Sequence, residues 1–205
     1  SIQSIYLWIG KLEEIKIIDP ACGSGHILIY AFDLLYNMYT EAGYRERDIP
    51  LLILENNLFG IEIDKRAMQI AGFALMMKGQ EKNRRFLRKA SEMKLNILEF
   101  VDSEDISLDA LLFLKDLVSD VSVVEEVMTL FENAKQFGSL LVPEQPASFY
   151  QEYADIIENL NVTVVDLINE VYIYELQEKL LPLLKQAYIL AKKYEVIVTN
   201  PPYHN

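Results

Sequence analysis

Several residue types that would define a class of protein are scarce in this sequence. It contains one cysteine, Cys22, and two histidines, so an internal disulfide framework is excluded and no metal site is expected. No apolar run reaches the roughly 18 residues of a membrane span, because charges interrupt even the helix-like segment 166–194. The opening residues, SIQSIYLWIGKLEE, lack the basic region and apolar run of a signal peptide. We therefore expect a cytoplasmic protein without a membrane partner.

Positive charge is also scarce, since 19 Lys and Arg face 31 Asp and Glu and leave a formal net charge of -12. Nucleic-acid-binding proteins normally carry clustered basic residues that contact phosphates, so the composition alone argues against a DNA enzyme. The clearest basic cluster comprises Lys82, Arg84, Arg85, Arg88 and Lys89. It is either a phosphate contact or a solvated helix face, and we favour the solvated face.

The patterning that is present favours an α/β fold. Hydrophobic residues make up 51% of the chain, enough for a globular core. Short apolar runs predict four β-strands, at residues 15–19, 58–64, 95–100 and 195–200. Helical periodicity follows the first two runs, at 26–42 and 65–79. Because strands and helices alternate, the sequence predicts a parallel sheet.

The segment between the last two predicted strands is far longer than an ordinary crossover connection. Its periodicity predicts helices at 123–137, 147–160 and 166–194, the last with a kink at Pro182. We interpret it as a helical insertion. The chain then divides into a cofactor-binding part (1–102), the insertion (103–194) and a final strand with its loop (195–205).

A glycine-containing loop, Asp19-Pro20-Ala21-Cys22-Gly23-Ser24-Gly25-His26, follows the first strand. Its two glycines allow a sharp bend and the close approach of a ligand to the main chain. The third glycine of a dinucleotide fingerprint is replaced by Leu28, and the loop has no lysine, so neither a pyrophosphate nor a triphosphate site is favoured. Asp19 either bonds the cofactor or braces the loop amides. We interpret Cys22 as a packed residue rather than a nucleophile.

Glu62 ends the second predicted strand, where a carboxylate can accept hydrogen bonds from both hydroxyls of a ribose. Such a site suits an adenosyl cofactor. Asp64 is better explained as the cap of the next helix. We treat residues 43–57, which separate Glu62 from the glycine loop, as a linker.

The tetrapeptide Asn200-Pro201-Pro202-Tyr203 follows the fourth strand, which predicts that Asn200 lies at the carboxyl edge of the sheet beside the glycine loop. The prolines make the turn rigid and leave the Asn200 side chain and the Pro201 carbonyl free to accept hydrogen bonds from an exocyclic amine. Two such acceptors make the nitrogen of the exocyclic amine more nucleophilic. Tyr203 can stack on a base extruded from a duplex. Alone, the tetrapeptide could be a structural turn. With the glycine loop and Glu62 it predicts methyl transfer by positioning and electrostatic stabilisation.

The motif DPACGSG precedes the motif NPPY in this chain. In both motifs and in their order, the chain resembles the gamma group of DNA adenine-N6 methyltransferases. The segments GSGHILIYAFDLLY, NLFGIEIDKRAMQIAGFALMMKG and RRFL are similar to the PglX-type methyltransferases of BREX phage-defence systems. This similarity covers about the first ninety residues and the last ten or so, and the helical insertion is compatible with the same group but carries no motif of it.

The resemblance implies a Rossmann-like fold that uses S-adenosyl-L-methionine. The implied cofactor residues are Asp19, Pro20, Ala21, Cys22, Gly23, Ser24, Gly25, Glu62 and Ile63. The residues implied at the target adenine are Asn200, Pro201, Pro202 and Tyr203. For the third motif, which contacts the cofactor adenine, we nominate Asn96, with Glu99 and residues 137–140 as alternatives.

The resemblance also implies site-specific methylation of double-stranded DNA in restriction-modification or phage defence, together with other defence subunits. We expect a fragment that is inactive by itself, because most DNA contacts would come from a C-terminal recognition region that is absent. The alternatives are methylation of a protein glutamine at N5, methylation of an RNA adenine, and a catalytically silent cofactor-binding scaffold.

Overall fold

The computed structural model describes residues 11–90, 93–118, 120–160 and 167–200 of the protein. The chain forms two compact units, one of Ser1–Glu99 with Lys193–Asn205 and one of Phe100–Lys192. These boundaries fall a few residues before the ones expected from the sequence. Among the described residues, no helix is both long enough and apolar enough to cross a membrane.

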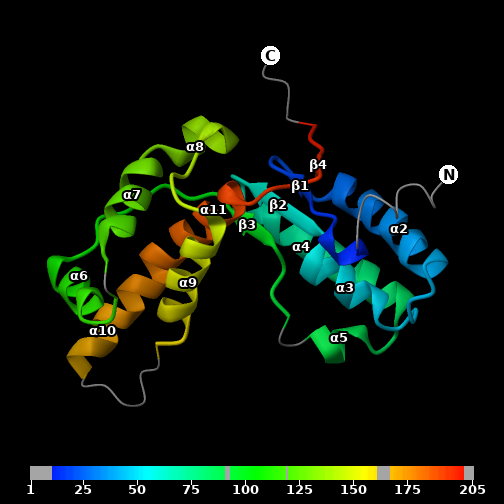
Figure 1. The fold of residues 1–205 in the computed structure, drawn as a ribbon, viewed down its shortest axis with the longest axis horizontal. Coiled ribbons are helices and arrows are strands. Elements are labelled where there is room, and N and C mark those ends of the chain that lie inside the picture. Colours follow the sequence, from blue (N-terminus) through cyan, green and yellow to red (C-terminus); the bar gives the residue numbers. More distant parts are fainter. Residues whose placement is uncertain (1–10, 91–92, 119, 161–166, 201–205) are drawn as a thin grey trace. The chain divides into compact units, whose positions relative to one another are not determined.

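The first unit is built on a four-stranded parallel sheet in the order β3-β2-β1-β4 (Figure 1). Its strands are β1 (Ile17–Asp19), β2 (Leu58–Glu62), β3 (Ile97–Glu99) and β4 (Val196–Ile197). In the register of the sheet, Asp19 lies opposite Gly60, and Glu62 lies opposite Glu99. The parallel sheet expected from the sequence is therefore present, and the carboxyl ends of its strands share one edge.

Three helices of this unit lie near the sheet, α2 (His26–Glu41), α3 (Ile49–Asn56) and α4 (Lys65–Lys82) (Figure 1). They share one hydrophobic cluster with the strands. Helices α2 and α4 correspond to the two predicted from periodicity. Helix α3 corrects our interpretation of residues 43–57 as a linker. Pro50 lies in its first turn, and the burial of Ile53 and Leu54 shows that packing on the core stabilises this short helix.

Asn57 joins three segments at the amino end of the sheet, and its side chain is fully buried. Its Nδ2 donates to the carbonyls of Leu12 and Ile15, both at 2.7 Å, and its Oδ1 accepts from the Tyr39 hydroxyl at 3.0 Å. The Asn57 carbonyl also accepts from the Ile17 N–H at 2.7 Å. One polar side chain thus connects the segment before β1 with α2 and with the start of β2.

The second unit is helical. It contains α6 (Leu108–Lys115), α7 (Ser122–Leu130), α8 (Ala134–Phe137), α9 (Ala147–Glu158), α10 (Leu167–Glu175) and α11 (Leu181–Ala191). Helix α6 was not anticipated from the sequence. The kink expected at Pro182 takes the form of a π-helical segment, Leu176–Leu180, directly before α11. Proline cannot donate to the carbonyl four residues earlier, which explains why the regular helix is interrupted there.

Gln186 of α11 is buried and binds the backbone of the segment that follows Phe100. Its Oε1 accepts from the Val101 N–H at 2.6 Å, and its Nε2 donates to the Val101 carbonyl at 3.1 Å. The Gln186 side-chain amide therefore satisfies both the N–H and the carbonyl of Val101, as the backbone of a paired β-strand would.

Candidate functional site

The loop between β1 and α2 has a backbone that requires glycine at two positions. Gly23 has a φ of 52° and Gly25 a φ of 84°, in the left-handed region that side chains disfavour. A Cβ on Gly25 would also lie 3.0 Å from the Cβ of Ala71 in α4. The N–H of Cys22 donates to the Ile61 carbonyl at 3.0 Å, which holds the loop against β2.

Glu62 connects this loop with the end of β2. Its Oε2 accepts from the Gly23 N–H at 2.7 Å, and its Oε1 accepts from the Asp64 N–H at 3.0 Å. The carboxylate is partly buried, so these hydrogen bonds form in a less polar setting than bulk water and are strengthened by its charge. The acid predicted from the sequence therefore lies beside the predicted glycine loop.

Asp19 stabilises the glycine loop by accepting a hydrogen bond from its backbone. It is 1% exposed, and its Oδ1 accepts from the Ala21 N–H at 3.1 Å. Burial raises the pKa of Asp19, hydrogen bonds from Ala21 and Thr199 lower it, and the nearby charge of Glu62 raises it. Of the two roles considered for Asp19, bracing of a loop amide is present in the structure. The Thr199 hydrogen bond also brings the residue before Asn200 to this edge.

Cys22 is a packed thiol. Its side chain is buried, and its Sγ approaches the Gly23 carbonyl at 3.8 Å. Burial, together with the charges of Asp19 and Glu62, raises the pKa of Cys22 to about 12. Since the thiolate is the nucleophilic form, this residue is not activated for attack. The other loop residues, Pro20 and Ser24, are partly exposed.

The turn after Glu62 contains an apolar side chain and a helix cap. Ile63 is 53% exposed, which leaves a hydrophobic surface beside the Glu62 carboxylate. Asp64 caps α4, because its Oδ1 accepts from the backbone N–H of Arg66 at 2.7 Å and of Ala67 at 3.1 Å. These backbone bonds, the one from Ala67 first, lower the pKa of Asp64. The interpretation of Asp64 as a cap is confirmed.

The candidates for the third motif lie at different places. Asn96 precedes β3 at its amino end, where Nδ2 donates to the carbonyls of Leu54 at 3.2 Å and Glu55 at 3.1 Å. Glu99 ends β3 at the carboxyl edge, opposite Glu62, and pairs with Lys65 at 3.8 Å. Residues 137–140 belong to the second unit. Glu99 is thus the candidate that shares an edge of the sheet with the glycine loop.

Asn200 is exposed and follows β4, which pairs with β1. The N–H of Val198 donates to the Ile18 carbonyl at 2.9 Å, so the chain that leads to Asn200 runs beside the end of β1. The pairing of β4 with β1 agrees with the parallel sheet expected from the sequence, and the place of Asn200 beside the glycine loop stays a prediction. Pro201, Pro202 and Tyr203 lie outside the described residues. Within the described residues, no group of three or more His, Cys, Asp and Glu is arranged to hold a metal ion.

Three residues that contribute to the site were not identified from the sequence. Ala71 and Thr199 contact Gly25 and Asp19, and neither carries a local signal of this role. Gly60 lies within β2, where a Cβ would be 2.9 Å from Cδ1 of Ile97 and 3.0 Å from Cδ1 of Leu28. Glycine within a strand indicates close backbone approach, so Gly60 could have been found by that signal.

A parallel sheet with a glycine loop after β1 and an acid at the end of β2 is consistent with a Rossmann-like methyltransferase fold. Comparison with known proteins identifies the family within that class. Residues 3–128 match the family described as the MmeI DNA-methyltransferase domain, and the chain belongs to this family.

Two relatives extend the similarity over nearly the whole chain. It is 35% identical over 214 residues to the adenine-specific methyltransferase BrxX of Escherichia coli, an alignment that covers 93% of this chain. It is 36% identical over 201 residues to the adenine-specific methyltransferase PglX of Lacticaseibacillus casei, which covers 94% of the chain. The chain spans 17% and 16% of the lengths of these two relatives.

Proposed function

We propose that this chain contributes the cofactor-binding and catalytic part of an enzyme that transfers a methyl group from S-adenosylmethionine to N6 of adenine in DNA. The observation that carries the proposal is the carboxyl edge of the sheet. There Glu62 is hydrogen-bonded to the glycine loop, and β4, which pairs with β1, leads to Asn200. The two relatives named as adenine-specific methyltransferases support adenine as the target.

The donors and acceptors at this edge fit an adenosyl cofactor. The two oxygens of Glu62 suit the two ribose hydroxyls, Gly23 and Gly25 allow close approach to the main chain, and the exposed Ile63 offers a surface for an adenine ring. When bound, S-adenosylmethionine supplies a methyl group on a positively charged sulfonium. The carboxylate of Glu62 at this edge complements that charge.

For the third motif we propose Glu99 in place of Asn96. The amide of Asn96 binds backbone carbonyls at the end of α3, whereas Glu99 ends β3 beside Glu62. A carboxylate can accept a hydrogen bond from the exocyclic amine of an adenine.

At the target base, the side-chain oxygen of Asn200 and the carbonyl of Pro201 would accept the two hydrogens of the amine. This orients the nitrogen lone pair toward the methyl donor, so the chain acts by positioning and by stabilising the charge that develops on nitrogen. Tyr203 would stack on the extruded base. We further propose that double-stranded DNA is the substrate and that the activity serves phage defence with other subunits.

Replacing Asn200 in the full-length chain tests this function. Asn200→Ala should reduce methylation of duplex DNA, measured as N6-methyladenine in a nucleoside digest, by at least about a hundredfold, as expected when a positioned polar group is lost from a transition state. Affinity for S-adenosylmethionine, measured by calorimetry, should be unchanged. Asn133→Ala, at an exposed asparagine of the second unit, is the matched control.

The products of the wild-type protein separate the other candidates. N5-methylglutamine in a protein substrate would assign protein methylation, and N6-methyladenine confined to RNA would assign RNA methylation. Cofactor binding with no methylated product would indicate a silent scaffold. An Asn200→Ala variant that methylates DNA at the wild-type rate would refute the role given to Asn200.

A further inference from the structure

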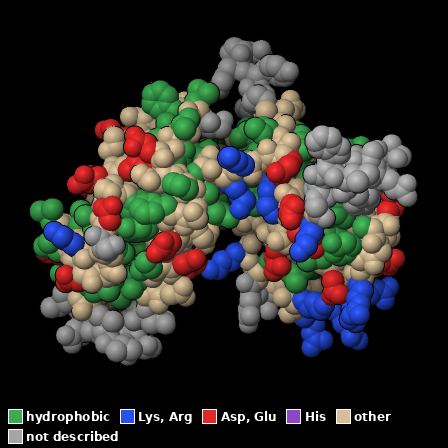
Figure 2. All heavy atoms as spheres, viewed as in Figure 1, with side chains coloured by type: hydrophobic (Ala, Val, Ile, Leu, Met, Phe, Trp, Pro, Cys, Tyr) green, Lys and Arg blue, Asp and Glu red, His purple; other side chains and the backbone are tan. Residues whose placement is uncertain are grey.

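Basic side chains are concentrated at one place on the first unit, although the protein as a whole is acidic. Figure 2 shows Lys and Arg gathered around α5 (Phe86–Lys89) and the neighbouring loop. We call this group the α5 basic patch, and it consists of Arg45, Arg47, Lys82, Arg84, Arg85, Arg88 and Lys89. In a chain with a net charge of -12 and 19 basic residues, seven of them at one place form a local positive surface.

Side-chain contacts hold the two segments of the patch together. The Nδ2 of Asn83 donates to the Arg47 carbonyl at 2.8 Å, and the Nζ of Lys89 pairs with Oδ1 of Asp48 at 2.9 Å. On the α4 side, Gln80 donates through Nε2 to the Arg84 carbonyl at 2.9 Å and accepts from the Leu87 N–H at 3.3 Å. The patch is therefore an ordered surface and not a loose basic tail.

Packing also anchors α5 itself. Phe86 is 1% exposed, and its ring lies so close to α4 that a Cβ on Gly79 would be 2.6 Å from its Cε1. Glycine at this position lets the ring approach the backbone of α4. The neighbouring Arg85, Arg88 and Lys89 then face the solvent.

The charges of the patch are only partly neutralised within the protein. Arg47 and Lys89 share Asp48, and Lys82 pairs with Asp33 at 3.7 Å. Arg45, Arg84 and Arg85 are exposed, and no ion pair to them is found among the residues that the structure describes. Five of the seven cations are arginines, whose planar guanidinium groups bind phosphate oxygens through two parallel hydrogen bonds.

The surroundings favour a polyanion over a folded protein as the partner. Within residues 82–89 the exposed large apolar side chain is Leu87, at 43%. Protein interfaces usually centre on buried aromatic and apolar anchors, and one leucine among arginines offers little of this kind. Nucleic-acid interfaces are instead polar and strongly positive on the protein side.

The patch lies far from the carboxyl edge of the sheet. Helix α4 begins next to Glu62 at that edge and ends at Lys82, and its 18 residues span ~27 Å at ~1.5 Å per residue. That length corresponds to about eight base pairs of B-DNA at ~3.4 Å each. A side chain in the patch therefore cannot reach a base held beside Asn200.

We propose that the α5 basic patch binds the phosphate backbone of duplex DNA outside the target site and contributes affinity without sequence specificity. The inference rests on the proposed function, because it takes DNA as the substrate. It assigns the basic residues to a phosphate contact and not to a merely solvated helix face.

Removal of the exposed arginines tests this inference in the full-length chain. The variant carries Arg45→Ala, Arg84→Ala and Arg85→Ala, and the control carries Lys11→Ala, Lys115→Ala and Lys135→Ala, which remove the same charge from exposed positions elsewhere. Affinity for a fluorescent duplex of random sequence is measured by anisotropy between about 50 and 200 mM salt. Loss of three phosphate contacts should reduce the slope of log K against log salt by about 2.7 and weaken binding at least tenfold at low salt.

The outcomes separate this inference from the proposed function. Equal affinity and slope in the two triple variants, or no duplex binding by the wild type, would overturn the inference. Unchanged duplex binding with lost binding of poly-L-glutamate would assign the patch to an acidic protein and overturn it as well. Adenine methylation by the wild type is assayed in parallel. If methylation is present but the arginine variant binds duplex DNA like the control, the inference about the patch is wrong and the proposed function stands. If methylation is absent but the arginine variant loses duplex binding, the inference about the patch stands and the proposed function is wrong.

Discussion

The Oε2 atom of Glu62 lies 2.7 Å from the backbone nitrogen of Gly23 and accepts its hydrogen bond. The acid that ends β2 therefore also holds the loop that follows β1. Because its second oxygen accepts from the Asp64 N–H, the carboxylate links both loops at the carboxyl edge of the sheet. A change at Glu62 should consequently affect ligand contacts and loop position together.

Cofactor affinity should depend strongly on this carboxylate. Glu62→Ala should weaken binding of S-adenosylmethionine by about tenfold to a hundredfold, since a hydrogen bond to a charged group contributes about 1.5–3 kcal/mol. Calorimetry measures the change, with Glu55→Ala as the control at an exposed glutamate of α3. Equal affinity of wild type and Glu62→Ala would exclude Glu62 as a ribose ligand.

Gly25 is required for two reasons, its positive φ angle and the lack of space for a Cβ beside Ala71. Comparison with Gly43 separates the energetic costs of these two effects. Both glycines have positive φ angles, 84° and 82°, but a Cβ on Gly43 would meet nothing within 4 Å. Gly43→Ala should therefore cost about 1–2 kcal/mol of stability from the backbone alone. Gly25→Ala should cost a further 1–3 kcal/mol or so, because its Cβ would press on Ala71.

Urea denaturation followed by circular dichroism measures both losses. Adding Ala71→Gly to Gly25→Ala should restore part of the additional loss by removing the Cβ that Gly25→Ala would contact. Equal stability of the two single variants would show that the loop moves away from α4 without cost.

Asn57 should be among the most sensitive polar positions of the first unit. Asn57→Ala leaves the carbonyls of Leu12 and Ile15 and the Tyr39 hydroxyl without their partner in a buried setting. Since each unsatisfied buried group costs about 1–3 kcal/mol, the variant should lose at least about 3 kcal/mol in urea denaturation. Asn56→Ala is the control, because the Asn56 side chain donates to Leu52 of its own helix. A loss no larger than that of the control would contradict this account.

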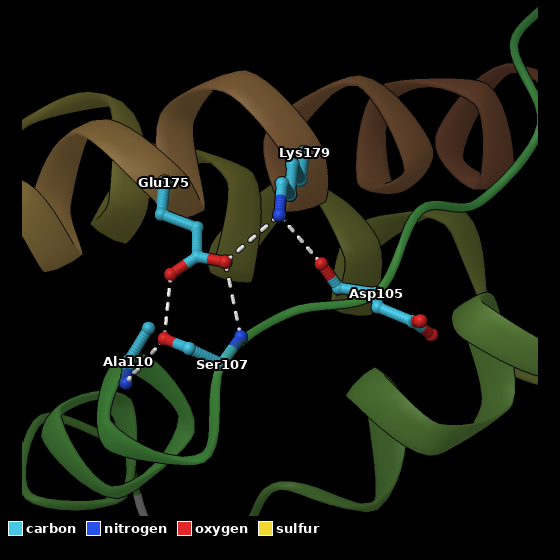
Figure 3. Close-up of polar contacts among 5 residues, drawn as sticks. All are labelled: Asp105, Ser107, Ala110, Glu175 and Lys179. Atoms are coloured by element: carbon cyan, nitrogen blue, oxygen red, sulfur yellow. Dashed lines mark hydrogen bonds and ion pairs between the residues drawn. The ribbon is translucent and has the colours of Figure 1, made fainter.

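Glu175 makes the stability of the second unit depend on pH (Figure 3). Its carboxylate accepts from the hydroxyl of Ser107 at 2.6 Å, from Lys179 at 2.9 Å and from the Ser107 N–H at 3.0 Å. These hydrogen bonds, the one from the Ser107 side chain first, lower the pKa of Glu175 from 4.5 to about 2. The depressed pKa means that the stabilisation is complete above pH 4.5 and is lost as the pH falls from 4.5 toward 2.

Glu175→Gln should therefore reduce stability at neutral pH and flatten its decline below pH 4.5. Thermal unfolding followed by circular dichroism across this range provides the measurement. Glu178→Gln is the matched control, because Glu178 is exposed and no hydrogen bond to its side chain is found among the described residues. Parallel pH profiles for wild type and Glu175→Gln would remove the basis for this prediction.

Patterns confined to one short segment were predictable from the sequence. The apolar runs predicted the four strands, the Gly23 and Gly25 spacing predicted the loop, and the position of Asp64 predicted a helix cap. Helices α3 and α6 were missed because each has eight residues, too few for a clear period. Such short helices are stable because they pack on the rest of the molecule, which local pattern does not reveal.

The choice between Asn96 and Glu99 for the third motif shows the limit of prediction from local sequence patterns. The two residues are three positions apart and belong to the same predicted strand. Only the register of β3 against β2 places Glu99 opposite Glu62 and leaves Asn96 at the other end, bonded to α3. Register depends on long-range packing and hydrogen bonding, so residue type alone could not decide between them.

The sequence by itself determined the class of fold, the order of glycine loop, acid and Asn-Pro-Pro-Tyr, and the presence of a helical segment between the last two strands. These features depend on local periodicity, turn chemistry and residue type. The tertiary structure decided which groups meet, including Glu62 with Gly23, Gly25 with Ala71, and Asn57 with Tyr39. Each of these pairs joins residues far apart in the chain, and their contacts arise only when the helices pack on the sheet.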